Sequence, residues 1–285
     1  MRAFAGEIFM RLPQWRRVVV KMGTQVVVED SVRFATERVS HLLNDFLDGV
    51  EERVLVTSGA VGLGRTALNV RAKNSLSISE KQACAAVGQS RLINEYDRLL
   101  QSRDIRAAQI LVTSDDLTHA QKFHNFSETL KELVRSGAFP IINENDSVSI
   151  AELQPTSGMK SENSFGDNDR LSALVATKIE ADLLVILSDI DGFYKTNPKV
   201  DPKAEKLTWI EDEKILSDIE SAETSIGGRG GVRTKIEAVQ MAARNGIYAV
   251  VASGFQPGIL KQILSMREWG DNAPCTWVAP TGKRL

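Results

Sequence analysis

The segment PIINEND, residues 140–146, places polar side chains at the end of a short apolar run. Residues 139–142 have the length and apolar character of a buried β-strand, and two amides and two carboxylates follow within residues 143–146. In an open α/β sheet, ligands bind in the crevice beyond the carboxyl ends of the strands. The segment therefore predicts an α/β fold with a polar site at this strand end.

A second polar group stands about twenty residues further on. Gly166, Asp167, Asn168 and Asp169 precede an apolar-periodic run, residues 171–179, that predicts a helix. We expect this group and the first to face one cleft. The alternative is that an aspartate merely caps the helix and that residues 143–146 form an ordinary turn, and neither segment decides the matter alone.

Composition limits the classes of partner. The chain has 285 residues, of which 42% are hydrophobic and 25% charged, enough for one large α/β domain or two small ones. Thirty-five basic and 37 acidic residues leave a formal charge of −2, with no long block of one sign. Neither nucleic acid nor an anionic membrane is therefore an expected partner.

The cysteines and histidines give no recognisable metal or triad pattern. Cys84 and Cys275 lie far apart, which fits a reducing cytosol and a cytoplasmic location. The histidines are expected on helix surfaces: His41, His119 and His124. No run approaches the roughly 20 apolar residues of a membrane span, and residues 1–15 read as an N-terminal arm rather than a signal peptide.

The first β-branched run, residues 18–20, ends at a lysine. Lys21 is followed by Gly23, which lets backbone N–H groups approach a phosphate closely. This pattern favours a central parallel strand whose exit carries a cation for an anionic ligand. A lysine that merely extends to solvent at a strand end is the alternative.

A second strand, residues 54–56, opens into Thr57, Ser58 and Gly59 and then a helix. A hydroxyl and exposed N–H groups at the positive end of a helix dipole predict an anion site here. Gly62, Gly64 and Ala67 also match a loose dinucleotide-binding fingerprint. That fingerprint is weak, because the acid it requires at the end of a second strand is missing and Glu80 begins a helix instead, with Ser79 and Gln82 in a capping-box pattern.

Strands and helices alternate along the rest of the chain. Periodicity predicts helices from Asp30 or Ser31 through residue 46, over 80–101 and over 119–136, and strands over 107–112, 183–187 and 248–252. Asp191 and Gly192 indicate a hairpin turn, and residues 147–165 a flexible excursion or lid. The pattern predicts a three-layer α/β/α sandwich with a mostly parallel central sheet in a single domain, residues 16–285.

A glycine loop, residues 227–231, runs into a helix that contains Thr234 and Lys235. The order of these residues excludes a Walker P-loop, yet a mobile glycine loop at a helix N-terminus still favours a phosphate site. Lys21 and Lys235 could therefore converge on a polyphosphate while Asp169 holds them apart. Phosphoryl transfer needs mainly such positioning and charge neutralisation, and a carboxylate acceptor would need no general base.

The chain resembles the bacterial glutamate 5-kinases of the amino acid kinase superfamily, from Val18 to Pro280. The segments that carry the resemblance are VVKMGT (19–24), VTSGAVG (56–62), AVGQSRL (86–92), PIINEND (140–146), FGDND (165–169), SDIDGFY (188–194) and GGVRTK (230–235). AVGQSRL, INEND and FGDND together are specific to this member of the superfamily.

The resemblance implies a role for each matching residue. Lys21, Lys235 and Asp169 would be catalytic. The glutamate would be bound by Ser58, Gly59, Asn143, Asp146 and Asn168. The ATP would be bound by Lys21, Gly23, Ser188, Asp189, Arg229, Gly230, Gly231, Val232, Arg233, Thr234 and Lys235. Mg²⁺ would bridge the phosphates of ATP with no dedicated protein ligands, and the product would be γ-glutamyl phosphate, for proline biosynthesis.

The resemblance also implies a homodimer or homotetramer through the helix 80–101, and proline as a feedback inhibitor. The chain departs from the family at Val232 and Arg233, which changes the expected nucleotide contacts, and in a longer excursion at 154–164. We also expect no C-terminal RNA-binding-like domain of the kind that many members carry. The alternatives are a catalytically silent amino-acid sensor, a superfamily member that acts on another carboxylate and, third, a dinucleotide oxidoreductase.

Overall fold

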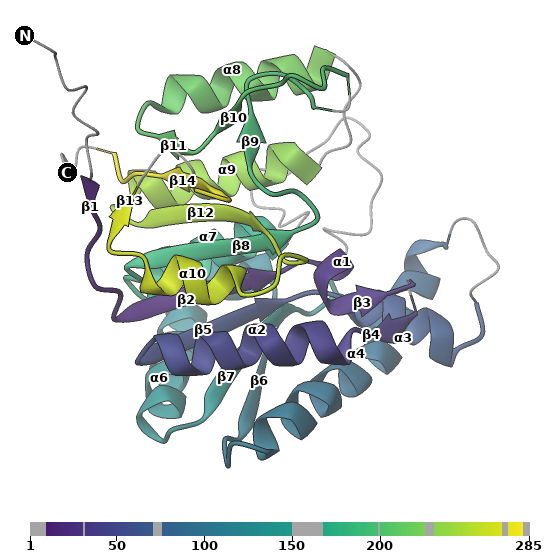
Figure 1. The fold of residues 1–285 in the computed structure, drawn as a ribbon. Coiled ribbons are helices and arrows are strands. Elements are labelled where there is room, and N and C mark those ends of the chain that lie inside the picture. The colour runs from purple at the N-terminus through teal and green to yellow at the C-terminus, as the bar shows by residue number, and fades with distance from the viewer. Residues whose placement is uncertain are drawn as a thin grey trace, which may run out of the picture.

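The computed structural model describes residues 10–30, 32–70, 76–149, 168–198, 200–225, 231–269 and 273–281. Within these ranges a sheet of eight strands crosses the molecule in the order β11-β14-β12-β8-β2-β5-β7-β6 (Figure 1). Its strands are β2 (Arg17–Met22), β5 (Glu52–Thr57), β6 (Ala107–Val112), β7 (Phe139–Glu144), β8 (Leu183–Ser188), β11 (Trp209–Ile210), β12 (Tyr248–Ser253) and β14 (Thr276–Val278). Only the β12–β14 pairing in this order is antiparallel, so the six strands from β12 to β6 all end at one edge.

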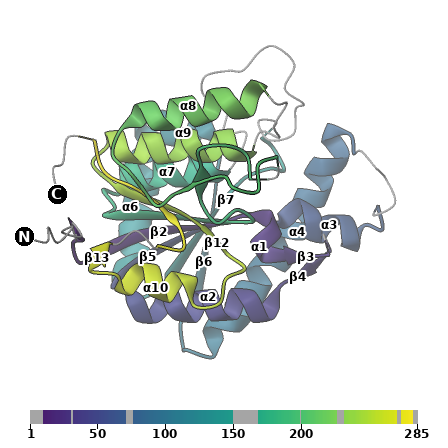
Figure 2. The same cartoon turned by 45° about the horizontal axis from the view of Figure 1, so that its top comes forward.

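Helices cover both faces of this sheet, which confirms the predicted α/β/α sandwich (Figure 2). One face packs against α2, α4 and α10, and the other against α6, α7, α8 and α9. The helices are α1 (Thr24–Val27), α2 (Thr36–Gly49), α3 (Ala60–Ala67), α4 (Ile78–Gln101), α5 (Ser114–Thr118), α6 (Ala120–Arg135), α7 (Asn168–Lys178), α8 (Glu213–Ser225), α9 (Gly231–Arg244) and α10 (Ile259–Ser265).

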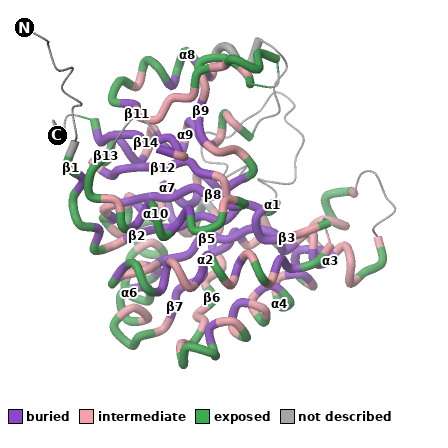
Figure 3. The backbone as a smooth tube through the Cα atoms, in the orientation of Figure 1, coloured by how far each residue is buried: buried purple, intermediate pink, exposed green. Residues whose placement is uncertain are grey.

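The β-branched runs become central strands because both of their faces are covered. Val18 and Val20 point into one core and Val19 into the other, and all three are fully buried. This is the burial that parallel strands under two helical layers require. The tube in Figure 3 shows the strands as the buried centre and the outer helix faces as the exposed surface.

The helix expected from Asp30 or Ser31 begins later, at Thr36. Asp30 has a left-handed φ of 53°, and the chain turns back there into a short hairpin of β3 (Val28–Glu29) and β4 (Arg33–Phe34). Ser31 lies outside the described residues. The predicted apolar face of the helix is buried from Val39 onward. Side-chain propensities in the sequence gave no sign that β3 and β4 would pair with each other.

Two local predictions need correction. Helix α4 is capped by Ser77 and Glu80 in a capping box, not by Ser79 and Gln82, so the helix begins two residues earlier than expected. Gly192 has a φ of 148°, but the strand after it, β9 (Phe193–Tyr194), pairs with β10 (Lys206–Leu207) and not with β8. The expected tight hairpin is therefore a longer excursion.

Two glycines bring α3 and α4 into direct backbone contact. A Cβ on Gly64 would lie 1.8 Å from the carbonyl oxygen of Cys84, and a Cβ on Gly88 would lie 1.8 Å from that of Ala60. The glycines of the apparent dinucleotide fingerprint are thus inside a helix, and Gly64 serves helix packing. This removes the structural context that a dinucleotide fingerprint requires.

Part of the expected N-terminal arm is built into the fold. β1 (Met10–Arg11) pairs with β13 (Glu268–Trp269), and the buried Trp15 ring stacks on Trp277 at 5.9 Å. Residues 1–9 and the excursion at 154–164 lie outside the described residues. In the part of the chain that is described, no helix has the length and apolarity needed to cross a membrane.

Candidate active site

Lys21 and Asp169 meet at the carboxyl edge of the sheet. Lys21 lies near the end of β2, and Asp169 is the second residue of α7. The lysine Nζ is 2.5 Å from Oδ1 of Asp169, and the side chains are 4% and 0% exposed. The strand end and the helix N-terminus together bury an ion pair where the sequence predicted a ligand site.

Lys235 reaches the other oxygen of the same carboxylate. It lies in the second turn of α9, and its Nζ donates to Oδ2 of Asp169 at 3.1 Å and to the carbonyl of Gly231 at 3.0 Å. Thr234 donates from its hydroxyl to the same Oδ2 at 3.1 Å. The structure therefore brings both lysines to Asp169, the residue that the sequence predicted to lie between them, and their convergence on a polyphosphate stays a prediction.

The electrostatics of this cluster favour a charged carboxylate. Burial raises the pKa of Asp169, but the charges of Lys21 and Lys235 and their hydrogen bonds outweigh that effect and hold its pKa below the usual range. Two cations and one anion leave one net positive charge. A polyanion at this edge of the sheet would be attracted by that charge.

Asn168, next to Asp169, connects the ends of two strands, β5 and β7. Its Nδ2 donates to the hydroxyl of Ser58 at 2.8 Å, to the carbonyl of Thr57 at 3.0 Å and to Oδ1 of Asn143 at 3.0 Å. Its own Oδ1 is buried and has no hydrogen-bond partner among the described residues. A buried acceptor without a hydrogen bond destabilises the folded state, and a donor would remove this cost. The Oδ1 atom therefore marks a place for an N–H group of a ligand.

Gln89 fixes the orientation of this amide network. Asn143 donates from Nδ2 to Oε1 of Gln89 at 2.8 Å, so its Oδ1 is turned toward Asn168. Gln89 belongs to the AVGQSRL segment but was not among the predicted site residues. The sequence offered three adjacent polar residues in that segment, Gln89, Ser90 and Arg91, and only the tertiary contact shows that Gln89 reaches the site.

Gly59 shapes the start of α3 next to Ser58. It has a left-handed φ of 111°, and a Cβ there would lie 2.9 Å from Cγ2 of Val28. Only glycine avoids both the backbone strain and the contact at this position. Ser58 is thereby held at the N-terminus of the helix with its hydroxyl on Asn168.

Strand β7 extends further than the sequence predicted. Asn143 and Glu144 are its last two residues rather than the first residues of a turn, because the pairing with β6 continues to Val112 and Glu144. Asp146 follows in the turn and is 6% exposed. The carboxylate is therefore withdrawn from water at the same edge of the sheet as Asn143.

The end of β8 forms the neighbouring part of the edge. Ser188 is buried and accepts a hydrogen bond from the N–H of Ile190 at 3.2 Å, whereas Asp189 is exposed. Gly23 donates from its N–H to the carbonyl of Leu187 at 3.0 Å. A Cβ on Gly23 would stand 3.6 Å from Nζ of Lys21, so the glycine leaves the space beside that ammonium open.

The start of α9 holds the other residues predicted to bind ATP. Gly231 is its first residue, and Val232 packs partly buried against the core. Arg233 is engaged by Glu220 at 2.9 Å and by Glu237 at 3.0 Å, so the phosphate contact expected of it would have to displace these carboxylates. Gly166, Asp167, Arg229 and Gly230 lie outside the described residues.

The two halves of the candidate site thus meet at the first turn of α7. On one side of Asp169 are the ammonium groups of Lys21 and Lys235, and on the side of Asn168 are neutral amides and the hydroxyl of Ser58. The first half is suited to neutralise phosphoryl oxygens, and the second to bind a small polar molecule. In this arrangement a group can pass between two bound molecules beside Asp169.

Comparison with known proteins gives consistent results. A family model described as "Amino acid kinase family" matches residues 16–253. A glutamate 5-kinase of Trichlorobacter lovleyi is 41% identical over 266 residues, which cover 91% of this chain and 67% of that protein. A glutamate 5-kinase of Clostridium perfringens is 38% identical, and the match covers 94% of this chain and 97% of that protein. A glutamate 5-kinase of Enterococcus faecalis is 35% identical, and the match covers 91% of this chain and 95% of that protein.

Solved structures resemble the fold at much lower identity. The UMP kinases of Ureaplasma parvum and Bacillus anthracis both superpose with a TM-score of 0.58 at 15% identity, over 94% of this chain and 100% and 97% of theirs. At this identity the likeness concerns the architecture alone.

Proposed function

The chain belongs to the amino acid kinase family, and we propose that it transfers the γ-phosphoryl group of ATP to the side-chain carboxylate of L-glutamate. The product is γ-glutamyl phosphate, the first intermediate of proline biosynthesis. The observation that carries the proposal is the buried cluster in which Lys21 and Lys235 hold the two oxygens of Asp169. The glutamate 5-kinases that match nearly end to end supply the substrate.

Charge neutralisation is the main task in this reaction. A carboxylate oxygen of glutamate attacks the γ-phosphorus, the new C–O–P linkage forms, and the bond to the bridging oxygen breaks so that ADP leaves. The acceptor is already ionised at neutral pH, with an unperturbed pKa of about 4.3, so no general base is needed. Negative charge spreads over the phosphoryl oxygens in the transition state, and Lys21 and Lys235 are placed to stabilise it.

Asp169 positions the lysines rather than reacting. Each ammonium has three N–H donors, and Lys235 uses two of them on Asp169 and Gly231. One donor of Lys235 thus has no acceptor among the described residues and is available to a phosphoryl oxygen. Asp169 also separates two like charges that would otherwise repel each other in a buried site.

The amide half of the site fits the amino acid. We assign the substrate ammonium to Asn168 Oδ1 and Asp146, since an N–H donor would satisfy the buried amide oxygen and a carboxylate would balance the charge. Ser58, Gly59 and Asn143 line the same strand ends. The side-chain carboxylate of glutamate would then extend toward Lys21.

Mg²⁺ is proposed to arrive with the nucleotide. In the described parts of the chain, no group of three or more His, Cys, Asp or Glu side chains could hold a metal ion. Mg²⁺ commonly binds through substrate phosphates with few protein ligands. A site with few carboxylate donors therefore fits a metal ion that is carried by ATP. Bound there, the ion would neutralise phosphate charge. Ser188, Asp189 and the start of α9 are proposed to contact the nucleotide.

Incubation with ATP, Mg²⁺ and L-glutamate should yield an acyl phosphate that hydroxylamine traps as a hydroxamate. L-aspartate, which is one methylene shorter, is the matched substrate control and should give far less product. ADP release that needs glutamate but gives no hydroxamate would contradict the acyl phosphate. ADP release with L-aspartate as efficient as with L-glutamate would favour another carboxylate substrate, and ligand binding without turnover would favour the silent sensor.

Regulation and assembly remain proposals. We propose that proline competes at the glutamate site and that the 24-residue helix α4 takes part in a homodimer or homotetramer. Sedimentation at micromolar concentration tests the assembly, and only monomer would contradict it. Inhibition by proline should be relieved by added glutamate but not by added ATP. The cytoplasmic location and the single-domain organisation also remain predictions.

A further inference from the structure

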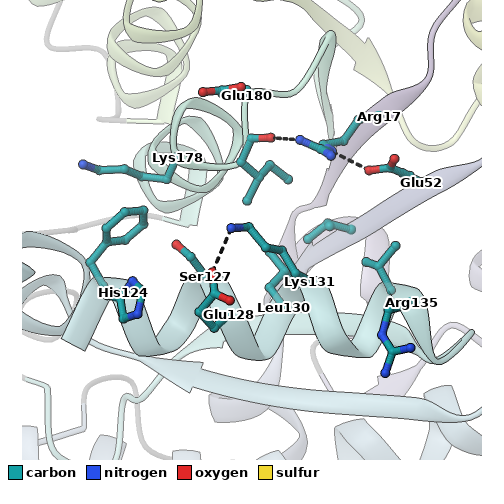
Figure 4. Close-up of a pocket in the computed structure, with 14 residues that line it drawn as sticks. Arg17, Glu52, His124, Ser127, Glu128, Leu130, Lys131, Arg135, Lys178 and Glu180 are labelled. Carbon is teal, nitrogen blue, oxygen red and sulfur yellow. Dashed lines mark hydrogen bonds and ion pairs between the residues drawn. The ribbon is translucent and has the colours of Figure 1, made fainter. Parts of the chain in front are cut away.

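A cavity lies at the edge of the sheet opposite the candidate active site. It has a volume of about 630 Å³ and is lined by the starts of β2 and β5, one side of α6 and the end of α7 (Figure 4). Arg17 begins β2, and Lys21 follows four residues later, so the strand separates the two places by about 13 Å. The cavity is therefore distinct from the site of Lys21 and Asp169.

The floor of this cavity is apolar and its rim is charged. Val54 and Leu130 are buried in the floor, and Phe123 and Val134 are partly buried beside them. Cavities of this size with an apolar floor and a few polar groups are typical of small-molecule sites. An occupant would therefore bury an apolar body against α6.

The positively charged groups at the rim differ in whether they already form an ion pair with a carboxylate. Arg17 is paired with Glu52 at 2.6 Å and donates to the carbonyl of Ile179, and Lys131 is paired with Glu128 at 2.8 Å. Arg135 is paired with Glu132, also through a short contact. These cations already have carboxylate partners.

Lys178 differs from the other cations of the rim. Its ammonium lies over the ring of Phe123, 4.5 Å from the centroid, and it forms no ion pair with any residue that the structure describes. A ring face attracts a cation but leaves its charge uncompensated, so the ammonium remains able to bind an anion. Glu180, two residues on, also lines the cavity and opposes such an anion.

Ser127 adds an unsatisfied donor between the two helices. Its hydroxyl is buried and has no hydrogen-bond partner among the described residues. Figure 4 shows Ser127 on α6 between His124 and Lys131, on the side that faces α7. A ligand oxygen that reached this hydroxyl would satisfy a group that otherwise costs free energy.

We propose that this cavity is a second ligand site, which binds a small anion with an apolar body. The acidic group of the ligand would lie between Lys178 and Ser127, and its apolar part against Leu130 and Val134. The ligand would contact α7, the helix whose first turn carries Asn168 and Asp169. The proposal is independent of the reaction proposed above and can be tested without it.

The test uses 8-anilinonaphthalene-1-sulfonate, a fluorescent aromatic anion, and its uncharged counterpart N-phenyl-1-naphthylamine. The sulfonate should bind saturably, and Lys178→Met should weaken it about fivefold, as expected for a partly exposed ion pair. Binding of the uncharged probe should change little. Lys214→Met is the matched control and should leave both probes unaffected, because Lys214 is an exposed lysine on α8 that pairs with no carboxylate in the described part of the chain.

Two further measurements locate the site and its charge preference. Bound sulfonate should slow amide hydrogen exchange in α6 and at the end of α7, and Glu180→Gln should strengthen its binding because one opposing charge is removed. Thermal unfolding of each variant shows whether the fold is retained. The proposal is overturned if no saturable binding occurs, if Lys178→Met and Lys214→Met behave alike, or if the protected amides lie elsewhere.

Discussion

The ammonium of Lys21 lies 2.5 Å from Oδ1 of Asp169, and both side chains are almost completely removed from water. Lys235 occupies the other oxygen of the same carboxylate at 3.1 Å. Breaking a buried pair leaves an uncompensated charge, which costs far more than breaking an exposed one. Substitutions in this cluster should therefore affect stability and catalysis together.

Asp169→Asn should lower the free energy of unfolding by about 3–5 kcal/mol, because two buried ammonium groups lose their shared anion. It should also lower kcat by on the order of a hundredfold or more. Urea titration and steady-state kinetics check both effects. Asp115→Asn is the matched control, since its 2.6 Å pair with Lys122 is exposed to solvent and its loss should hardly change the free energy of unfolding. Equal effects of the two substitutions would contradict the proposed role of Asp169.

Lys235→Ala should lower kcat by on the order of a hundredfold or more, while KM for glutamate changes little. The reason is that an interaction formed mainly in the transition state affects kcat, whereas uniform binding affects KM. Lys235→Arg should not restore activity, because a planar guanidinium does not fit the acceptors Asp169 and Gly231 as a compact ammonium does. A kcat within a small factor of the parent would rule out the two-lysine mechanism.

Asp146→Ala should raise KM for glutamate roughly ten- to hundredfold, since a charge-assisted hydrogen bond of about 1.5–3 kcal/mol is lost. KM for ATP should barely move. Asp189→Ala, at the exposed residue after β8, is the contrasting variant and should raise KM for ATP instead. If Asp146→Ala weakens ATP as much as glutamate, Asp146 belongs to the nucleotide or metal site.

Gly88→Ala should destabilise the protein by at least about 3 kcal/mol, because its Cβ would be placed 1.8 Å from the backbone oxygen of Ala60. Backbone cannot move aside as a flexible side chain can, so α3 and α4 would have to separate. Gly137→Ala is the control: its φ is +73°, but the space around it is open, so only about 1 kcal/mol of strain is expected. Chemical denaturation of both variants measures the difference, and similar losses would refute the packing role of Gly88.

Stability should fall as the pH rises above about 8.5, the pKa of an unfolded cysteine. Burial raises the pKa of Cys275 to about 12. Between these values the unfolded thiol loses its proton and the folded one keeps it, so rising pH favours unfolding. Cys275→Ala should make this decline shallower, as measured by urea titration from pH 8 to 10. Ellman's reagent should label neither buried thiol of the folded protein at pH 8.

The sequence alone was sufficient to predict the fold class and to single out charged residues that the structure brings together, whose roles stay predictions. Runs such as Val18–Val20 and Leu183–Leu187 are strands because their β-branched and apolar side chains need cover on both faces, and this requirement is local in the sequence. Lys21, Asn143 and Asp146 lie at or just beyond the ends of strands, and Asn168 begins α7, so the parallel arrangement brings all four to one edge. The segments INEND and FGDND then indicated at which edge of the sheet to expect the functional site.

The tertiary structure alone decided which atoms meet. The two oxygens of Asp169 are shared by lysines from β2 and α9, and Gln89 turns the amide of Asn143. Gly64, which matched the dinucleotide fingerprint, packs α3 against α4 together with Gly88. Periodicity describes the burial of one element at a time, whereas these contacts depend on how separate elements dock. Side-chain pairing across the sheet edge is set by that docking, and no local pattern in the sequence records it.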